Sequence, residues 1–341
     1  MAALTALNKK IIFLFFAGLL ALSVFVAAAK AQETTTESTI GKTGIQVSAP
    51  VYNFGINPGE SAQEIIKIRN VGASAQTFYP EVLDFKPAGE SGTPTFLKTT
   101  ESASYTYSLA SWITISTQGI TLEPKESAAL NFTINVPKNA EAGGHYAGIL
   151  FGTTAPATTG TGVAISNKVG SLVLVRVAGD AKEIATLKEF STPKNSYEKG
   201  PVDFIVRVQN SGSVHVIPKG TIEIKNIFGR SVASLNVNDK NGNVLPDSVR
   251  RFDKESDNLS WKPDGFTFGR YKADLLLTYG SPAKTLAGSV TFWVVPWVQL
   301  LIMLAILIVL VLLLVFAVKR YNRMVANRAL KKEHESAEKS G

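Results

Sequence analysis

The chain of 341 residues contains no cysteine and only three histidines. Disulfides commonly stabilise small secreted modules of eukaryotes, so their absence fits a bacterial envelope protein better. His145 and His215 lie in different predicted domains and His334 lies in the C-terminal tail, which argues against a zinc site. The Gly-x-Ser-x-Gly and His-Glu-x-x-His motifs and a phosphate-binding glycine loop are also absent. We therefore predict a protein that is not an enzyme and needs no metal or cofactor.

The middle of the chain lacks an excess of charge of either sign, although the whole chain carries a net charge of +8. Residues 1–31 and 319–341 together hold 10 basic and 3 acidic residues, out of totals of 35 and 27. The remaining 25 basic and 24 acidic residues leave residues 32–318 nearly neutral. The basic residues therefore belong to the two ends, and no nucleic-acid partner is predicted.

A long hydrophobic run near the N-terminus has the features of a secretory signal peptide. Lys9 and Lys10 precede the apolar residues 11–29, and a small-x-small sequence follows. We predict a signal peptide over residues 1–31 with cleavage between Ala31 and Gln32, and the alternative is an uncleaved signal anchor. The polar residues 32–43 predict a disordered lead-in.

A second uncharged run covers residues 294–318. As an α-helix, its segment Trp297–Val318 would span about 33 Å, enough to cross the hydrocarbon core of a bilayer. Trp293 lies at one edge of the run and Lys319 opens a basic segment at the other, and positive charge marks the cytoplasmic side. We predict one transmembrane helix and a basic cytoplasmic tail over residues 319–341. The protein would be a single-pass type I protein of the cell membrane, with the N-terminus outside and the C-terminus inside.

Between the two runs, apolar and polar residues alternate over short segments. Residues 130–136 (LNFTINV) alternate strictly, and residues 63–69 and 201–209 show the same period of two. No segment between residues 44 and 292 carries a helical repeat of ten or more residues. Short alternating segments separated by turn residues indicate antiparallel sheets, so we predict a mainly β fold built from sandwiches.

The two halves of this region share a turn motif. An alternating strand ends at Asn70 and Gly72 in the first half and at Asn210 and Gly212 in the second, with one residue between each pair. Asparagine and glycine are typical turn residues because they tolerate backbone conformations that other residues avoid. We predict a structural turn at each position.

A second motif, Gly-x-Tyr, follows in the same order at residues 144–146 and 269–271. Two shared motifs in the same order suggest an internal repeat. We predict two tandem Ig-like antiparallel β-sandwich domains, over residues 44–180 and 181–292, followed by the single transmembrane helix. The alternative is that both motifs are general features of sandwiches.

The second half also contains a hairpin signal. Asn241 and Gly242 lie between the apolar segments 232–237 and 243–245. Both central residues of a type I′ turn need a positive φ, which asparagine and glycine adopt most readily. We predict a hairpin turn with Asn241 and Gly242 at its centre.

His145 and Tyr146 are the only candidate ligand contacts that the sequence offers. At the start of an apolar strand they can line a sugar-binding surface through stacking and hydrogen bonds. Because side chains alternate along a strand, they are expected on opposite faces, with one of them in the core. The alternative for Tyr146 and Tyr271 is a structural role, in which the hydroxyl bonds to nearby backbone as in a tyrosine corner.

The first predicted domain carries several motifs in a recognisable order: residues 57–60 (NPGE), 122–127 (LEPKES), 137–138 (PK), 143–144 (GG) and 149–152 (ILFG). In these motifs it resembles the bacterial DUF916 family, the peptidoglycan-binding part of WxL-interacting proteins. The order of signal peptide, two sandwiches, helix and basic tail is also similar, although the second domain matches the family poorly. The resemblance implies attachment to peptidoglycan and to surface partners, and it assigns no binding residue.

We therefore expect a non-enzymatic, membrane-anchored protein of the cell surface. Its outer sandwich would contact peptidoglycan or another envelope protein. The alternative is an accessory or assembly subunit of a membrane protein complex, in which the sandwiches hold a partner close to the bilayer.

Overall fold

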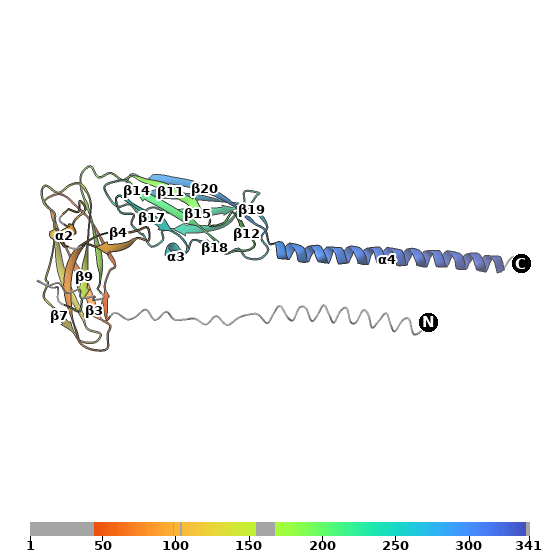
Figure 1. Ribbon diagram of the computed structural model, residues 1–341, viewed down its shortest axis with the longest axis horizontal. Coiled ribbons are helices and arrows are strands. Elements are labelled where there is room, and N and C mark those ends of the chain that lie inside the picture. Colours follow the sequence, from red (N-terminus) through yellow and green to blue (C-terminus); the bar gives the residue numbers. More distant parts are fainter. Residues whose placement is uncertain (1–43, 98, 103, 155–167, 339–341) are drawn as a thin grey trace. The chain divides into compact units, whose positions relative to one another are not determined.

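The computed structural model describes residues 44–97, 99–102, 104–154 and 168–338. It confirms the predicted fold class, because the chain is mainly β with Ig-like sandwiches and one apolar helix at the C-terminal end (Figure 1). The predicted signal peptide, its cleavage site at Ala31 and Gln32, and the predicted lead-in lie outside the described residues.

The first sandwich consists of two sheets that follow from the alternating segments. One sheet has the order β1 (Ile45–Val47), β3 (Ser61–Asn70), β8 (Ser127–Asn135) and β6 (Ile113–Ile115). The other has the order β2 (Val51–Ile56), β10 (Val169–Val177), β9 (Gly143–Gly152), β4 (Gln76–Ala88) and β5 (Thr93–Phe96), and β7 (Ile120–Leu122) also pairs with β4. Alternate residues of β8, namely Leu130, Phe132 and Ile134, are buried in the core between the sheets.

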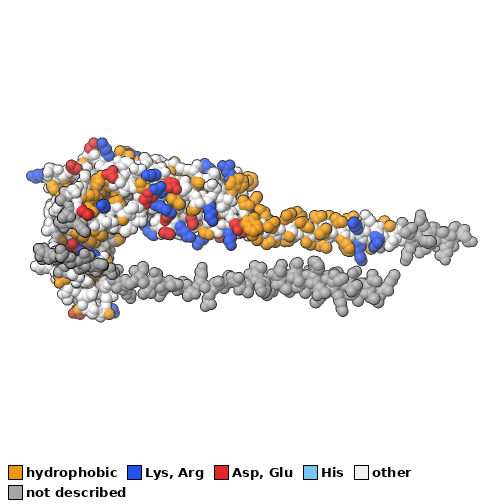
Figure 2. Space-filling view, in the orientation of Figure 1, with side chains coloured by type: hydrophobic (Ala, Val, Ile, Leu, Met, Phe, Trp, Pro, Cys, Tyr) orange, Lys and Arg blue, Asp and Glu red, His pale blue; other side chains and the backbone are white. Residues whose placement is uncertain are grey.

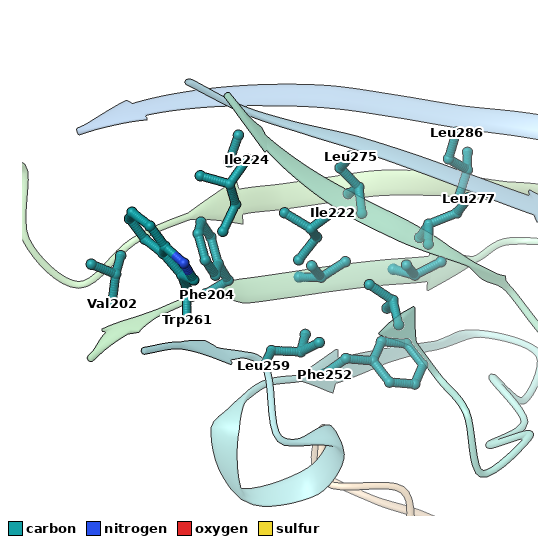
Figure 3. Packing of buried hydrophobic residues seen from close by; sticks show 14 of the residues in the cluster. Val202, Phe204, Ile222, Ile224, Phe252, Leu259, Trp261, Leu275, Leu277 and Leu286 are labelled. Carbon is teal, nitrogen blue, oxygen red and sulfur yellow. The ribbon is translucent and has the colours of Figure 1, made fainter. Parts of the chain in front are cut away.

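The second sandwich repeats this arrangement. One sheet contains β11 (Ala185–Ser191), β14 (Ile205–Asn210) and β17 (Ser248–Phe252). The other has the order β12 (Ser196–Tyr197), β20 (Lys284–Val294), β19 (Gly269–Tyr279), β15 (Lys219–Lys225) and β16 (Ser231–Val237), and β13 (Val202–Asp203) pairs with β18 (Ser260–Trp261). Figure 3 shows Phe204, Ile222 and Leu275 pointing into the space between the sheets. Burying one such phenylalanine completely stabilises the fold by about 1.5–3 kcal/mol.

The pairing of strands shows the same topology in both sandwiches. β2 runs parallel to β10 and β12 runs parallel to β20, whereas the β1–β3, β11–β14, β9–β10 and β19–β20 pairs are antiparallel. Two separate hydrophobic clusters fill the sandwiches, one within residues 45–177 and the other within residues 185–294. The boundary near residue 180 stays a prediction.

The register of the strands changes one part of the predicted repeat. Gly143, the first residue of β9, pairs with Val177, and Gly269, the first residue of β19, pairs with Val294. Both glycines adopt a positive φ, of 140° and 121°. Gly269 therefore corresponds to Gly143, so the two Gly-x-Tyr motifs are offset by one residue.

The segment around Asn241 and Gly242 differs from the predicted hairpin. The turn is centred two residues earlier, with the Asn241 amide donating to the Asn238 carbonyl at 3.1 Å. Asn238 and Asn241 adopt the positive φ, whereas Gly242 does not. Val244 then pairs with Val216 instead of β16. The Asn238 side chain explains the shift, because its amide donates to the Pro218 carbonyl at 2.8 Å and fixes the start of the turn.

The helices within the sandwiches are short, as the sequence predicted: α2 (Thr99–Ser102), the 3₁₀ turn η1 (Ala110–Trp112) and α3 (Lys254–Asp257). The long helix α4 covers Trp297–Glu338. It begins later than the predicted residue 294, because β20 continues to Val294. Pro296 has no N–H to donate, and its carbonyl accepts the first helical hydrogen bond, from the Leu300 amide at 3.0 Å.

The helix α4 also extends through the predicted tail. Within its segment Trp297–Asn327, a stretch of 18 residues has a mean hydropathy of 3.6 and contains no buried residue. The segment is therefore long and apolar enough to cross a membrane. Figure 2 shows its hydrophobic surface followed by basic side chains. In the sequence, the first of these basic residues is Lys319.

Candidate functional site

An open groove of about 740 Å³ lies on the first sandwich, between β4 and the edge strand β6. Residues of β4, β6 and the following turn line it: Tyr79, Pro80, Glu81, Val82, Ile113, Thr114, Ile115, Thr117, Gln118 and Gly119. A groove of this size is in the range of ligand-binding sites in proteins.

Strand edges border the groove on two sides. β6 is the last strand of its sheet, and β9 pairs with only one edge of β4 along Tyr79–Asp84. On the other edge of β4, β7 pairs with residues 76–78 and β5 pairs with residues 85–88. Within the part of the chain that the structure describes, no strand pairs with that edge along residues 79–83. Unpaired strand edges offer main-chain donors and acceptors to an extended polymer.

The side chains of the groove combine one aromatic ring with neutral polar groups. Tyr79 is half-buried, and Thr114, Thr117 and Gln118 are exposed. Gly119 lies against the Tyr79 ring, since a Cβ atom at this position would lie 2.6 Å from the ring carbon Cε1. A ring fixed beside hydroxyl and amide groups is suited to a sugar or a peptide.

Charge within the groove is neutralised locally. The Glu81 carboxylate forms an ion pair with the ammonium group of Lys168. Glu81 is the only acidic residue among those lining the groove. Hydrolysis of a glycosidic bond generally uses two carboxyl groups, whereas the lining of this groove contains one.

His145 lies on β9 with its side chain directed into the first sandwich, and it is 5% exposed. Its Nδ1 lies 2.9 Å from the Ser108 carbonyl oxygen and its Nε2 lies 3.2 Å from that of Glu141. The imidazole packs on Trp112, with ring centroids 4.3 Å apart. His145 therefore does not line the groove, and the ligand contact predicted for it stays a prediction.

Tyr146 points to the opposite face of β9, as predicted, but it is fully buried as well. Its ring packs with Phe85, Leu174 and Leu245, and Leu245 comes from the second sandwich. The Tyr146 hydroxyl accepts a hydrogen bond from the main-chain N–H of His215 at 2.9 Å. We expected only one of the two adjacent residues in the core, and the difference arises because a second apolar cluster covers the outer face of β9.

Further polar contacts join the two sandwiches, which belong to one compact unit of the chain. The Gly144 amide donates to the Ser213 carbonyl at 2.8 Å, and the Tyr107 hydroxyl donates to the Asp247 carboxylate at 2.7 Å. The Arg207 guanidinium forms an ion pair with Glu90. These partners are far apart in sequence, and no motif indicated them.

Burial sets the protonation of the groups at this junction. It raises the pKa of Tyr146 well above its ordinary value, and together with the hydrogen bond to Asp247 it raises the pKa of Tyr107 to about 12. Burial, with the nearby charge of Arg176, lowers the pKa of His215 to about 4. Both hydroxyls and the imidazole are therefore neutral at pH 7, which is consistent with a structural junction.

The predicted turn residues have structural roles in both sandwiches. The Asn70 side chain accepts a hydrogen bond from the Gly72 amide at 2.8 Å, and the Asn210 side chain accepts one from the Gly212 amide at 2.9 Å. Among the described residues, no three His, Cys, Asp or Glu side chains are grouped so that they could hold a metal ion.

No protein-family model and no curated protein matches the sequence. Solved structures with a similar fold include the class 5 fimbriae chaperone CfaA, with 10% identity, a TM-score of 0.35, and coverage of 73% of this chain and 98% of that one. The YadV chaperone has 9% identity, a TM-score of 0.34, and coverage of 73% and 100%. The E. coli chaperone DraB has 12% identity, a TM-score of 0.33, and coverage of 72% and 95%. Similarity at this level concerns the fold alone and does not indicate what this chain binds.

Proposed function

We propose that this chain is a non-enzymatic, membrane-anchored protein of the cell surface whose first sandwich binds peptidoglycan. The observation that carries the proposal is the groove between β4 and β6. It has strand edges on two sides, a fixed aromatic ring and neutral polar side chains, and its only lining carboxylate is paired with Lys168. Such a groove suits an extended, uncharged or weakly charged polymer of sugars and peptides.

The helix α4 supports the membrane anchor in this proposal. It is uncharged until Lys319, and basic residues follow at once. Positive residues are retained on the cytoplasmic side of a membrane, so the sandwiches lie outside the cell and the C-terminus lies inside. The first sandwich is separated from α4 by the whole second sandwich in the chain, which leaves its groove free to face the cell wall.

The choice of peptidoglycan rests on the resemblance of the first sandwich to the DUF916 family. Two of the motifs that carry it lie in turns of that sandwich, at residues 57–60 and 122–127. The LEPKES motif begins at the end of β7, which pairs with β4 next to the groove. The motif is thus close to the groove, although none of its residues lines it.

Retention of the full chain on purified peptidoglycan tests the proposal. The full chain in detergent micelles is expected to sediment with insoluble peptidoglycan. The variant Gln118→Arg places a long charged side chain in the groove and is expected to reduce the bound fraction about tenfold, since steric exclusion and desolvation of the guanidinium cost about 1.4 kcal/mol or more. The matched control is Gln63→Arg, an exposed glutamine of β3 outside the groove, which is expected to bind like the unmodified chain.

Two results would count against the proposal. Background retention of the unmodified chain would exclude peptidoglycan, and equal retention of both variants would exclude the groove as its site. The alternative function, an accessory subunit of a membrane complex, predicts a different observation. Crosslinking in native membranes would then yield one membrane protein partner in a fixed ratio to this chain.

A further inference from the structure

Large apolar side chains are exposed at one end of the second sandwich. Phe228 is 85% exposed and Ile227 is 63% exposed in the turn between β15 and β16. Phe266 and Phe268 are each 55% exposed in the segment before β19, and Trp293 is 50% exposed near the end of β20. We call these five residues the aromatic tip. A contiguous patch of this kind marks an interaction surface, whereas single exposed apolar residues do not.

The strand register places the aromatic tip at a single end of the sheet. Lys225 at the end of β15 pairs with Lys272 near the start of β19. Gly269 at the start of β19 pairs with Val294 at the end of β20. A Cβ atom on Gly269 would lie 3.8 Å from the Ile227 side chain, so the β15–β16 turn and the segment before β19 are neighbours.

The helix α4 leaves the sandwich from this same end. The Val295 amide donates to the Tyr197 carbonyl at 2.8 Å, so the chain is held to the sheet up to that residue. Only Pro296 then separates it from Trp297, the first residue of α4. Figure 2 shows hydrophobic side chains gathered where the sandwich meets the helix. The aromatic tip therefore lies at the end of the sandwich from which the apolar helix α4 begins.

We propose that the aromatic tip inserts into the outer interface of the bilayer that α4 crosses. The inference rests on the membrane anchor of the proposed function. Aromatic rings favour the interface between headgroups and hydrocarbon. The exposed Arg230 and Arg270 flank the tip and can contact anionic headgroups. With two attachments, α4 and the tip, the second sandwich has a fixed orientation on the membrane instead of pivoting about residues 295–296.

Site-directed labelling of the full chain tests this proposal, and the absence of native cysteine allows one label for each variant. Phe228→Cys and Phe268→Cys carry an environment-sensitive fluorophore at the tip. Lys240→Cys lies in the turn at the opposite end of β16, and Leu276→Cys lies in the middle of β19, at a residue that is 53% exposed. Leu307→Cys marks the middle of the apolar part of α4. The proteins are reconstituted in vesicles of phosphatidylcholine and phosphatidylglycerol, with and without nitroxide-labelled lipids.

The expected result is that labels at residues 228 and 268 lose about half of their emission when nitroxide lipids are present, as residues at the interface would. The label at residue 307 is quenched as well, and those at residues 240 and 276 are not. If the label at residue 307 is quenched but the labels at residues 228 and 268 keep their emission, as the label at residue 240 does, the tip proposal is overturned and the anchor stands. If residue 307 is not quenched, the anchor itself fails. If unlabelled Phe228→Cys chains form disulfides with one another in dilute vesicles after addition of a mild oxidant, the tip contacts a second copy of the chain, which also overturns insertion.

Discussion

The side-chain amide nitrogen of Asn70 lies 2.9 Å from the main-chain oxygen of Leu122. The same nitrogen donates to the Ser74 carbonyl at 2.9 Å, and the side-chain oxygen accepts from the Gly72 amide. One fully buried side chain therefore satisfies three main-chain groups and joins the end of β3 to the end of β7. Asn210 forms the equivalent set of three hydrogen bonds in the second sandwich.

Replacement of Asn70 by alanine is expected to lower the free energy of unfolding by about 2–4 kcal/mol, because three main-chain groups lose their partner and the bond to Leu122 is buried. Urea unfolding of the full chain in detergent micelles, followed by circular dichroism, measures the change. The control is Asn57→Ala, since Asn57 is exposed and its side chain bonds to the nearby, exposed Glu60. That variant is expected to stay within about 0.5 kcal/mol of the unmodified chain. Equal urea midpoints for the two variants would show that the Asn70 bonds contribute little.

The sequence predicted the turn at Asn70 but not the bond to Leu122. The turn depends on local preferences of Asn and Gly, which are visible in the sequence. Leu122 is 52 residues away, and it comes near because the turn after β7 meets the end of β3, where the Lys125 amide donates to the Asn70 carbonyl at 2.9 Å. The alternation of residues 130–136 was similarly sufficient to predict which side of β8 is buried, because alternate residues of a strand point to the same face and the apolar ones all lie on one face.

Neither the burial of both His145 and Tyr146 nor the groove was predicted, for different physical reasons. Residues 143–152 (GGHYAGILFG) are buried throughout and show no alternation, which is typical of a strand covered on both faces. This signal was present in the sequence and could have indicated that both residues are buried. The groove had no such signal, because it depends on how the edge strand β6 lies relative to β4 in the folded sandwich.

The structure assigns the role of a hydrogen-bonded tyrosine to Tyr279 rather than to Tyr271. The Tyr279 hydroxyl accepts from the Ala185 amide at 3.1 Å and lies 3.2 Å from the Ala185 carbonyl oxygen, to which it can donate. The Tyr271 hydroxyl has no hydrogen bond to the described residues. Tyr279→Phe is therefore expected to lower the free energy of unfolding by about 1–3 kcal/mol, whereas Tyr271→Phe is expected to have almost no effect. Thermal unfolding of both variants measures the difference, and a larger loss for Tyr271→Phe would refute this assignment.

Gly143 is expected to tolerate no side chain. Its φ is +140°, and a Cβ atom would lie 2.6 Å from the main-chain oxygen of Ser213 in the second sandwich. Gly143→Ala is expected to destabilise the chain by about 2 kcal/mol or more through strain and the displaced contact. Gly55→Ala is the matched control, because no atom lies within 4 Å of its added Cβ and its backbone is not in the positive-φ region. Urea midpoints compare the two variants, and a Gly143→Ala midpoint as high as that of the control would contradict the expected clash.

Acidification is expected to destabilise the junction between the sandwiches through His215. Burial and the charge of Arg176 lower its pKa to about 4, whereas a histidine in an unfolded chain has a pKa of about 6.5. Between these pH values, the unfolded chain binds a proton that the folded chain does not bind. The free energy of unfolding therefore falls as the pH decreases from about 6.5 to 4, by up to about 3 kcal/mol, and this contribution is constant below that range.

The variant His215→Gln isolates this effect, because glutamine does not titrate and keeps the main-chain N–H that donates to the Tyr146 hydroxyl. Protonation of His215 would also place a second N–H against that hydroxyl, which lies 3.3 Å from Nδ1. Urea unfolding is measured for both proteins at pH 7.5, 6 and 5, above the range in which most carboxylates titrate. The unmodified chain is expected to lose more stability between pH 7.5 and 5 than the variant does. Parallel pH profiles would mean that His215 is not the group whose protonation weakens the junction.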